Sequence, residues 1–201
     1  MSTVTEPKQD RSRLTRQRIL EATVQSLASR GWEASSVAVI AADAGTSRGA
    51  LQHHFPTRED LIVAALDFMF EKRSELVRTV TVPDLTGTER VAHVLHTIIE
   101  VYVGTLFGAA LQVWTAAAAD EVLRDRIVPL ERKFGSGVHA MTIRLLGVDD
   151  TDPHVRTLIQ ATLDMIRGLA LADLLTDDSR RRRRVVGAWA QQLSEGLGLT
   201  E

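Results

Sequence analysis

A twenty-residue segment that begins at Ser36 constrains the fold most, because it can form only two very short helices. Its sequence is Ser-Val-Ala-Val-Ile-Ala-Ala-Asp-Ala-Gly-Thr-Ser-Arg-Gly-Ala-Leu-Gln-His-His-Phe. Ser36 and Ser47 each stand where a side-chain oxygen caps the N-terminus of a helix. Gly45 lies between them and permits a left-handed turn. The segment therefore predicts helices over residues 37–44 and 48–54, joined by a tight turn.

The apolar residues of this segment predict how the two short helices pack. Ala41 is small enough for the helices to approach closely, and Val37, Ile40 and Leu51 are placed to hold the pair against a neighbouring helix. The second helix is then left with short polar and basic groups on its outer side, namely Ser47, Arg48, Gly49, Gln52 and His53. Such groups suit base edges in the major groove of DNA, so the pattern predicts a helix-turn-helix.

The rest of the chain is expected to be helical as well. Hydrophobic residues make up 44% of the 201 residues and aromatic residues only 4%, and alternating apolar runs bounded by turns are rare. We expect an all-α fold of about nine helices. Besides the two short ones, they cover residues 13–30, 57–78, 89–103, 106–118, 120–146 and 153–175, with a last helix that ends near residue 197.

Local signals set several of these boundaries. Gly31 should end the first long helix. Thr57 and Asp60 resemble a capping box, with aspartate in place of the usual glutamate. Pro129 should bend the helix over residues 120–146. Asp152 should cap the next helix, whose first residue is a proline.

Composition excludes several classes of protein. The chain has no cysteine, which excludes disulfides and thiolate chemistry. The polar start, Met1–Asp10, does not read as a signal peptide, and the longest apolar stretch, Leu106–Ala119, is too short to span a bilayer. We therefore expect a cytoplasmic protein that does not bind membranes. His53 and His54 lack a third ligand at helical spacing, so we expect no metal and no cofactor.

Motifs on both sides of the helix-turn-helix resemble one family. Thr-Arg-Gln-Arg-Ile-Leu-Glu precedes it from Thr15, and His-His-Phe-Pro-Thr-Arg-Glu-Asp-Leu closes it from His53. With these flanks, residues 13–66 resemble the tetracycline-repressor (TetR) family of transcriptional regulators. The resemblance implies an all-helical homodimer that binds operator DNA and also binds a small molecule. Such a protein is usually a repressor, and the small molecule releases it from the operator.

The resemblance also implies a division of the chain. Residues 1–12 would form a disordered arm, residues 13–60 a three-helix DNA-binding domain, and residues 61–201 a ligand-binding and dimerisation domain, joined through the fourth helix. The stretch over residues 81–88, with a proline and a glycine, reads as a linker after that helix.

Roles in DNA binding are carried over from the family by position. Ser36, with the backbone of Val37, would hold a phosphate at a helix N-terminus. Gln52 departs from the family, which commonly has tyrosine there, and Arg58 stands where lysine is usual. The complete set of expected DNA contacts is Arg16, Ser36, Val37, Thr46, Ser47, Arg48, Gly49, Gln52, His53 and Arg58.

The C-terminal part offers candidates for a ligand pocket that takes a largely apolar effector. They are aromatic, histidine and methionine residues, together with one glutamate: His93, His96, Glu100, Tyr102, Phe107, Trp114, Phe134 and Met141. His96 and Glu100 are four residues apart and would form a polar pair in the cavity. Each residue taken alone also fits an ordinary core position.

Two helices near the C-terminus have the pattern of a dimer interface. The resemblance implies a four-helix interface, and the expected residues are Leu158, Thr162, Met165, Leu169, Val186, Trp189 and Leu193. The alternative is that one of these faces covers the core of the same subunit. The arginine run over residues 180–184 reads as a solvated rim beside this interface or as a second contact to nucleic acid.

Two other functions remain as alternatives. A small helical enzyme or binding protein would use the C-terminal cavity, with His93, His96 and Glu100 as its polar groups. The sequence contains no nucleophile elbow, phosphate loop or metal motif, so we expect no catalytic residues. A pure interaction module would use the surface of the last two helices.

Overall fold

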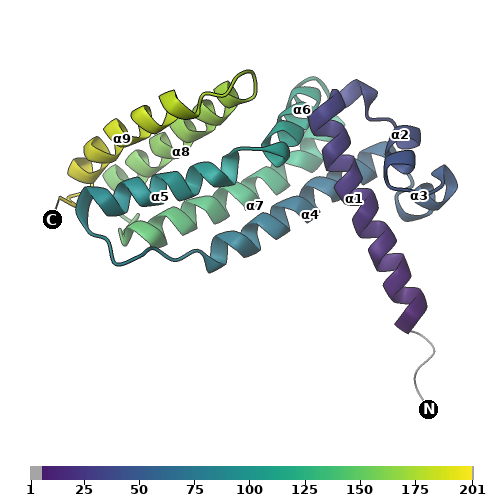
Figure 1. The fold of residues 1–201 in the computed structure, drawn as a ribbon, viewed down its shortest axis with the longest axis horizontal. Helices are drawn as coiled ribbons and strands as arrows, with labels where there is room; N and C mark the ends of the chain where they lie inside the picture. The colour runs from purple at the N-terminus through teal and green to yellow at the C-terminus, as the bar shows by residue number, and fades with distance from the viewer. Residues whose placement is uncertain (1–5, 201) are drawn as a thin grey trace, which may run out of the picture. The chain divides into compact units, whose positions relative to one another are not determined.

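The computed structural model describes residues 6–200, with side chains from Asp10 onwards except that of Leu76. Within this range all regular structure is α-helical, as expected, and nine helices follow one another without a strand (Figure 1). They are α1 (Glu6–Ala34), α2 (Val37–Asp43), α3 (Arg48–His54), α4 (Arg58–Thr79), α5 (Gly87–Tyr102), α6 (Thr105–Ala119), α7 (Glu121–Leu146), α8 (Pro153–Asp173) and α9 (Ser179–Gly196).

Helix α1 begins earlier than the sequence predicts. The expected disordered arm covers residues 1–12, of which residues 1–5 lie outside the described part, but the backbone is helical from Glu6. Extending an existing helix by one residue is much easier than nucleating one, so a polar stretch can continue an anchored helix outward. Asp10 also accepts a hydrogen bond from Arg13, one turn later, at 3.5 Å. At the other end Gly31 breaks the regular helix with φ +80°.

The helices form two compact units. The first unit comprises Met1–Glu71 with Thr105–Leu130, and the second comprises Lys72–Gly104 with Glu131–Glu201. Helices α4 and α7 therefore contribute residues to both units. The limits of the DNA-binding domain, placed above at residues 13 and 60, stay a prediction.

In the first unit α1 is the central element. Helices α2, α3 and α6 all pack on it, and α6 lies against its C-terminal part (Figure 1). The contacts bury one stripe of α1 because its apolar residues recur at helical spacing. The fully buried side chains of this unit include Ile19, Leu20, Leu27, Ile40, Leu51, Leu61, Ile62 and Leu66.

The first turn of α4 is closed by the expected capping box. The backbone N–H of Asp60 donates to the Thr57 hydroxyl at 3.0 Å, and the Thr57 N–H donates to the Asp60 carboxylate at 3.2 Å. Arg126 donates to the same carboxylate at 2.8 Å. Hydrogen bonding from Thr57, followed by that from Arg126, lowers the pKa of Asp60. Aspartate thus replaces glutamate in the box without loss of either hydrogen bond.

The second unit is a bundle in which α5 packs against α8 and α9 (Figure 1). As predicted, Asp152 caps α8, and its side chain accepts from the N–H of His154 at 2.8 Å. The core combines apolar residues of four helices: Val91, Val94, Leu95, Ile98, Val138, Met141, Leu145, Ile159, Leu163, Ile166, Val186, Ala190 and Leu193.

Within residues 6–200 no single helix is both long and apolar enough to cross a membrane. The pair α5 and α6 passes the same criteria together, by length and composition alone, as a bent pair.

Replacing Gly45 tests whether its backbone conformation stabilises the fold. Gly45 has φ +62°, and an added Cβ would meet nothing within 4 Å, so only the backbone resists a side chain. Gly45→Ala should lower the free energy of unfolding by about 1 to 2 kcal/mol, the usual cost of a left-handed conformation for an L-residue. Urea denaturation measures the change. Gly49→Ala is the matched control: position 49 is helical and equally open, so its stability should not fall.

Candidate nucleic-acid interface

The two short helices α2 and α3 are each fixed at their N-terminus by a serine. The Ser36 side chain accepts a hydrogen bond from the N–H of Val39 at 3.3 Å, and Ser47 accepts from the N–H of Ala50 at 3.1 Å. Between the helices, the N–H of Thr46 returns to the carbonyl of Ala41 at 2.9 Å. These bonds satisfy backbone groups that short helices otherwise leave unpaired, so the turn has one defined geometry.

Burial divides α3 into an inner and an outer side. Leu51 is fully buried, and on α2 Ile40 and Ala41 are buried too. The outer side of α3 with its cap carries side chains and one glycine that are all exposed: Ser47, Arg48, Gly49, Gln52 and His53. The structure thus brings these five predicted residues together on one surface. Val37, Thr46 and Ser36 are half-buried beside it.

Arg16 lies beside the same short helix pair. Its guanidinium carbon is 5.2 Å from the centre of the Phe55 ring, and Phe55 itself is buried at the end of α3. The Arg16 side chain remains exposed. A cation held against an aromatic face in this way has a restricted position and still presents its charge to the solvent.

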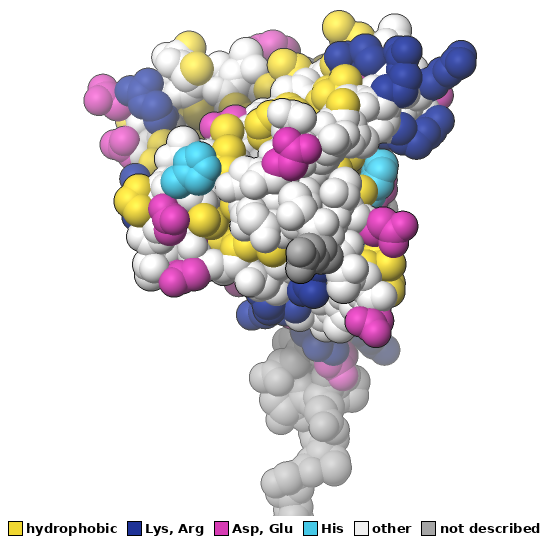
Figure 2. Space-filling model, turned by 90° about the vertical axis from the view of Figure 1, so that its left-hand side faces the viewer, with side chains coloured by type: hydrophobic (Ala, Val, Ile, Leu, Met, Phe, Trp, Pro, Cys, Tyr) yellow, Lys and Arg dark blue, Asp and Glu magenta, His cyan; other side chains and the backbone are white. Residues whose placement is uncertain are grey.

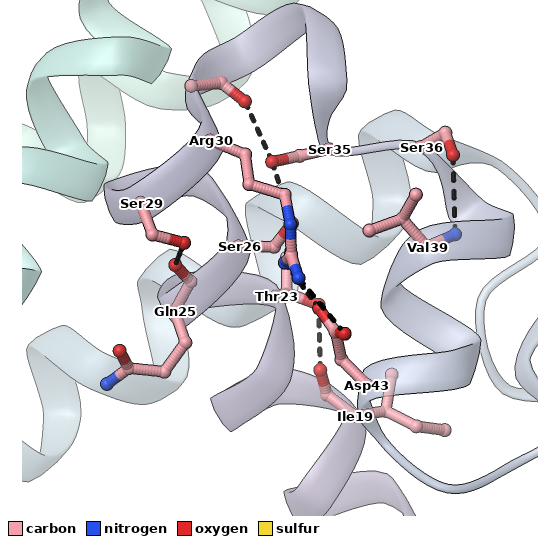
Figure 3. Close-up of polar contacts among 11 residues, drawn as sticks. Ile19, Thr23, Gln25, Ser26, Ser29, Arg30, Ser35, Ser36, Val39 and Asp43 are labelled. Carbon is pink, nitrogen blue, oxygen red and sulfur yellow. Dashed lines mark hydrogen bonds and ion pairs between the residues drawn. The ribbon is translucent and has the colours of Figure 1, made fainter.

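A set of polar contacts anchors α2 to α1 (Figure 3). Arg30 on α1 donates two hydrogen bonds to the Asp43 carboxylate, at 2.5 and 3.3 Å. Nearby, the buried hydroxyls of Ser26 and Ser35 are 3.0 Å apart, and Ser35 also donates to the carbonyl of Gly31 at 2.8 Å. Sequence analysis missed the pairs of Ser26 with Ser35 and of Arg30 with Asp43, because these partners are nine and thirteen positions apart and follow no helical period.

Arg58 is used inside the chain, whereas the resemblance implies a phosphate contact. Its Nε donates to the carbonyl of Ser35 at 3.1 Å, and its Nη2 donates to the carbonyl of Trp32. Its guanidinium also lies 4.2 Å from the centre of the Trp32 ring. Two carbonyls and an aromatic face fit the planar guanidinium better than a lysine ammonium. In this structure Arg58 therefore acts on the residues that lead into Ser36.

The same residues are held from α6. The N–H of Trp32 donates to the Gln112 side chain at 3.3 Å, and a Cβ on Gly31 would come within 3.2 Å of that oxygen. Gln112 is eighty residues away from Trp32 in the sequence, which explains why local patterns do not reveal it. Residues 31–35 are the kinked last turn of α1 and the residue that follows it. We call them the hinge loop, and Arg58 and Gln112 hold them in place.

The expected ligand-pocket residues divide between the two units. Phe107 and Trp114 form an edge-to-face pair in the first unit, with ring centres 6.0 Å apart. Tyr102, Phe134 and Met141 are buried in the second unit.

The three polar candidates of that pocket all lie on α5. His93 is half-buried there, whereas His96 and Glu100 are exposed. Helix α5 buries its apolar side and turns His96 and Glu100 outward, and their place in a ligand cavity stays a prediction. In the described part of the chain, no three His, Asp or Glu side chains come together as a metal site.

Most of the expected dimer residues are already used within one chain. Thr162, Leu169, Val186 and Leu193 are buried in the second unit. Their burial within one chain fits the alternative that they cover the core of the same subunit, since an amphipathic pattern indicates burial and not the partner.

The other three expected dimer residues, Leu158, Met165 and Trp189, are half-buried. The Trp189 indole N–H donates to the Thr162 hydroxyl at 3.0 Å.

The arginine run at the start of α9 is divided in its contacts. Arg182 pairs with Asp173 at 2.5 Å, and Arg181 pairs with Asp178. Arg180, Arg183 and Arg184 are exposed. Lys and Arg side chains gather at one upper edge of the face in Figure 2. The aspartates thus neutralise part of the run, as the alternative of a solvated rim requires.

A capped pair of short helices, with a tight glycine turn and a polar, basic outer side, defines a helix-turn-helix DNA-binding protein. Residues 19–65 match the family model "Bacterial regulatory proteins, tetR family". The transcriptional regulator BetI of Pseudomonas fluorescens is 31% identical over 179 residues, covering 86% of this chain and 88% of that protein. The chain belongs to the TetR family of transcriptional regulators.

Further comparisons agree with this family. The regulator PksA of Bacillus subtilis is 34% identical over 113 residues, which span 56% of this chain and 54% of PksA. A TetR-family structure from Streptomyces coelicolor A3 is 25% identical, with a TM-score of 0.66, and covers 89% of this chain and 97% of that one. The multidrug binding protein EbrR, solved with ethidium, is 26% identical with a TM-score of 0.59, covering 87% and 97%.

Replacing Arg58 separates a positioning role from a phosphate contact. Arg58→Gln should lower the free energy of unfolding by about 1 to 3 kcal/mol, because two charge-assisted hydrogen bonds and the contact with Trp32 are lost. Operator affinity should fall, but the dependence of log Kd on log salt should keep its slope. Thermal denaturation and salt titrations measure these quantities. A slope reduced by about one, with stability unchanged, would instead show a direct phosphate contact.

Proposed function

We propose that this regulator is a repressor that binds a two-fold symmetric operator as a homodimer and is released by a small molecule. The observation that carries the proposal is the outer side of α3, where Ser47, Arg48 and Gln52 are exposed together. These groups lie on the side of α3 opposite the fully buried Leu51, where they are accessible to a duplex.

Each exposed group suits a particular part of DNA. The Arg48 guanidinium matches the two acceptors of guanine, and the Gln52 amide matches the donor and acceptor of adenine. Ser36 accepts from its own helix, which leaves its O–H free to donate to a phosphate beside Val37. Arg16, Thr46, Gly49 and His53 lie around these groups and complete the proposed contact surface. Arg58 supports the surface from within.

A dimer supplies two copies of α3 to successive major grooves, about 34 Å apart along the DNA. We place its interface on α8 and α9, where Leu158, Met165 and Trp189 are half-buried. The buried residues beneath them would support this surface without touching the partner. Operator binding would also place the protein in the cytoplasm, with the DNA.

A small-molecule effector is supported by relatives that carry bound compounds. EbrR was solved with ethidium and with proflavin. In this chain we propose that the effector binds through the second unit, near Tyr102, Phe134 and Met141. A coupling of about 1 to 3 kcal/mol between effector and DNA is enough for regulation. The chain would act by binding and not by catalysis.

The operator test uses the DNA upstream of the protein's own gene in a gel-shift titration. Wild-type protein should give a sequence-selective shift that weakens as salt rises. Arg48→Ala should weaken specific binding about tenfold or more, because a base contact is lost. Arg183→Ala removes an equally exposed arginine from α9 and should change the affinity less than twofold.

Two results would contradict the operator proposal. One is equal binding to the upstream DNA and to random DNA of the same length. The other is an equal loss of affinity in both variants, because that would trace binding to overall charge and not to α3.

The dimer test changes the half-buried Met165. Met165→Glu should shift the protein from dimer to monomer in light scattering, because a carboxylate would be buried at the interface without a partner. Operator binding should weaken in parallel. Gln160→Glu adds the same charge on an exposed side of α8 and should leave the dimer intact. A Met165→Glu protein that is still dimeric would place the interface elsewhere.

A further inference from the structure

A polar cluster lies in the second unit, apart from the DNA interface. It joins Tyr102 of α5, Glu131 and Phe134 of α7, and Asp164 and Arg167 of α8. The Arg167 guanidinium lies 5.6 Å from the centre of the Tyr102 ring, and the rings of Tyr102 and Phe134 meet edge to face at 6.0 Å. We call these five residues the Glu131 cluster.

The carboxylate of Glu131 is poorly satisfied within the chain. Its Oε1 is 3.9 Å from Arg167 Nη2, an ion pair that is too long for a hydrogen bond. Its Oε2 is buried and has no hydrogen-bond partner. Burial raises the pKa of Glu131, and Arg167 offsets only part of that effect. Buried polar atoms in folded proteins nearly always have a partner, so an open carboxylate oxygen marks a place for one.

The charges around Glu131 do not balance. Arg167 also faces Asp164 at 3.3 Å, so one guanidinium is shared between two carboxylates. Asp164 is exposed and solvated, whereas Glu131 is only about one-third exposed, at 29% of its side chain. The cluster as a whole therefore has one negative charge in excess, and that excess is least screened at Glu131.

The aromatic part of the cluster is held in a fixed position. Tyr102 is the last residue of α5, and Arg73 closes this end of the helix by donating to the carbonyls of Glu100 at 2.6 Å and of Val103 at 3.2 Å. A cation at the C-terminus of a helix is favoured by the helix dipole. The tyrosine ring therefore does not depend on a ligand for its placement.

We propose that the Glu131 cluster recognises the effector, and that the effector is an organic cation. Its positive charge would lie against the part-exposed carboxylate of Glu131, beside the buried rings of Tyr102 and Phe134. An anionic effector fits less well, because the Arg167 guanidinium already faces two carboxylates and only its buried Nε donor has no partner. This inference rests on the proposed function, since it names the chemical class of the molecule that releases the operator.

The test is calorimetric titration of the full-length protein without DNA. The probes are two organic cations, ethidium and tetraphenylphosphonium, and one anionic dye of similar size, fluorescein. Both cations should bind, and fluorescein should bind at least tenfold more weakly. Glu131→Gln keeps the shape and removes the charge, and it should weaken both cations about tenfold or more. Glu89→Gln makes the same change at an exposed carboxylate in the first turn of α5, at the opposite end of that helix from Tyr102, and should change affinity less than twofold.

Three outcomes would overturn the inference: neither cation binds, fluorescein binds more tightly than both, or Glu131→Gln binds the cations as wild type does. A gel shift with the same variants separates this inference from the proposed function. Glu131→Gln should keep operator binding. If wild-type protein binds no operator while cation affinity depends on Glu131, the repressor proposal fails and the cation site stands. If wild-type protein binds operator but neither cation, the cation site fails and the repressor proposal stands.

Discussion

The placement of α2 and α3 depends on the hinge loop, which is the kinked last turn of α1 together with Ser35. Gly31 breaks α1 with φ +80°, and a helix that ends leaves backbone carbonyls without their regular partners. Arg58 donates to two of these carbonyls, and Gln112 accepts the N–H of Trp32. Each bond replaces one that water would otherwise make. Since Ser36 begins α2 directly after this loop, the loop decides the direction in which α2, and with it α3, leaves α1.

This arrangement relates α4 to both parts of the proposed function. Arg58 is the first residue of α4 and holds the hinge loop, whereas Arg73, four turns later, holds the end of α5 that carries Tyr102. A helix transmits displacement along its axis because its hydrogen bonds resist stretching. An effector at the Glu131 cluster would thus act on a residue that shares a helix with Arg58. Coupling of this kind needs no contact between effector and DNA.

Features decided within a few residues could be predicted from the sequence. The caps at Ser36 and Ser47, the turn at Gly45 and the box of Thr57 with Asp60 each involve partners no more than five positions apart. The start of α1 is less predictable, because a polar stretch next to an anchored helix can either continue that helix or remain without regular structure. Sequence analysis missed Gln112, the pair of Arg30 with Asp43, and the partners of Arg58 within the chain. Their partners come from other helices, and a single sequence contains no periodic sign of such contacts.

The buried faces of α8 and α9 show a second limit of sequence patterns. An apolar stripe predicts that residues leave water, and Val186 and Leu193 do so, but against their own chain. The hydrophobic effect is non-directional, so the stripe does not name its partner. The residues that can still gain from a partner are those left half-buried, such as Met165.

The two proposed binding surfaces use charge in opposite ways. Arg48 and its neighbours are exposed, so their attraction for phosphate acts through water and is weakened by salt. Glu131 lies in a less polar environment, where a charge is weakly screened and costly to leave unpaired. The first surface can therefore bind and leave a long polyanion readily, with base contacts adding selectivity. The second holds a small ligand only if that ligand brings the missing charge, which makes its response selective for chemistry rather than for size.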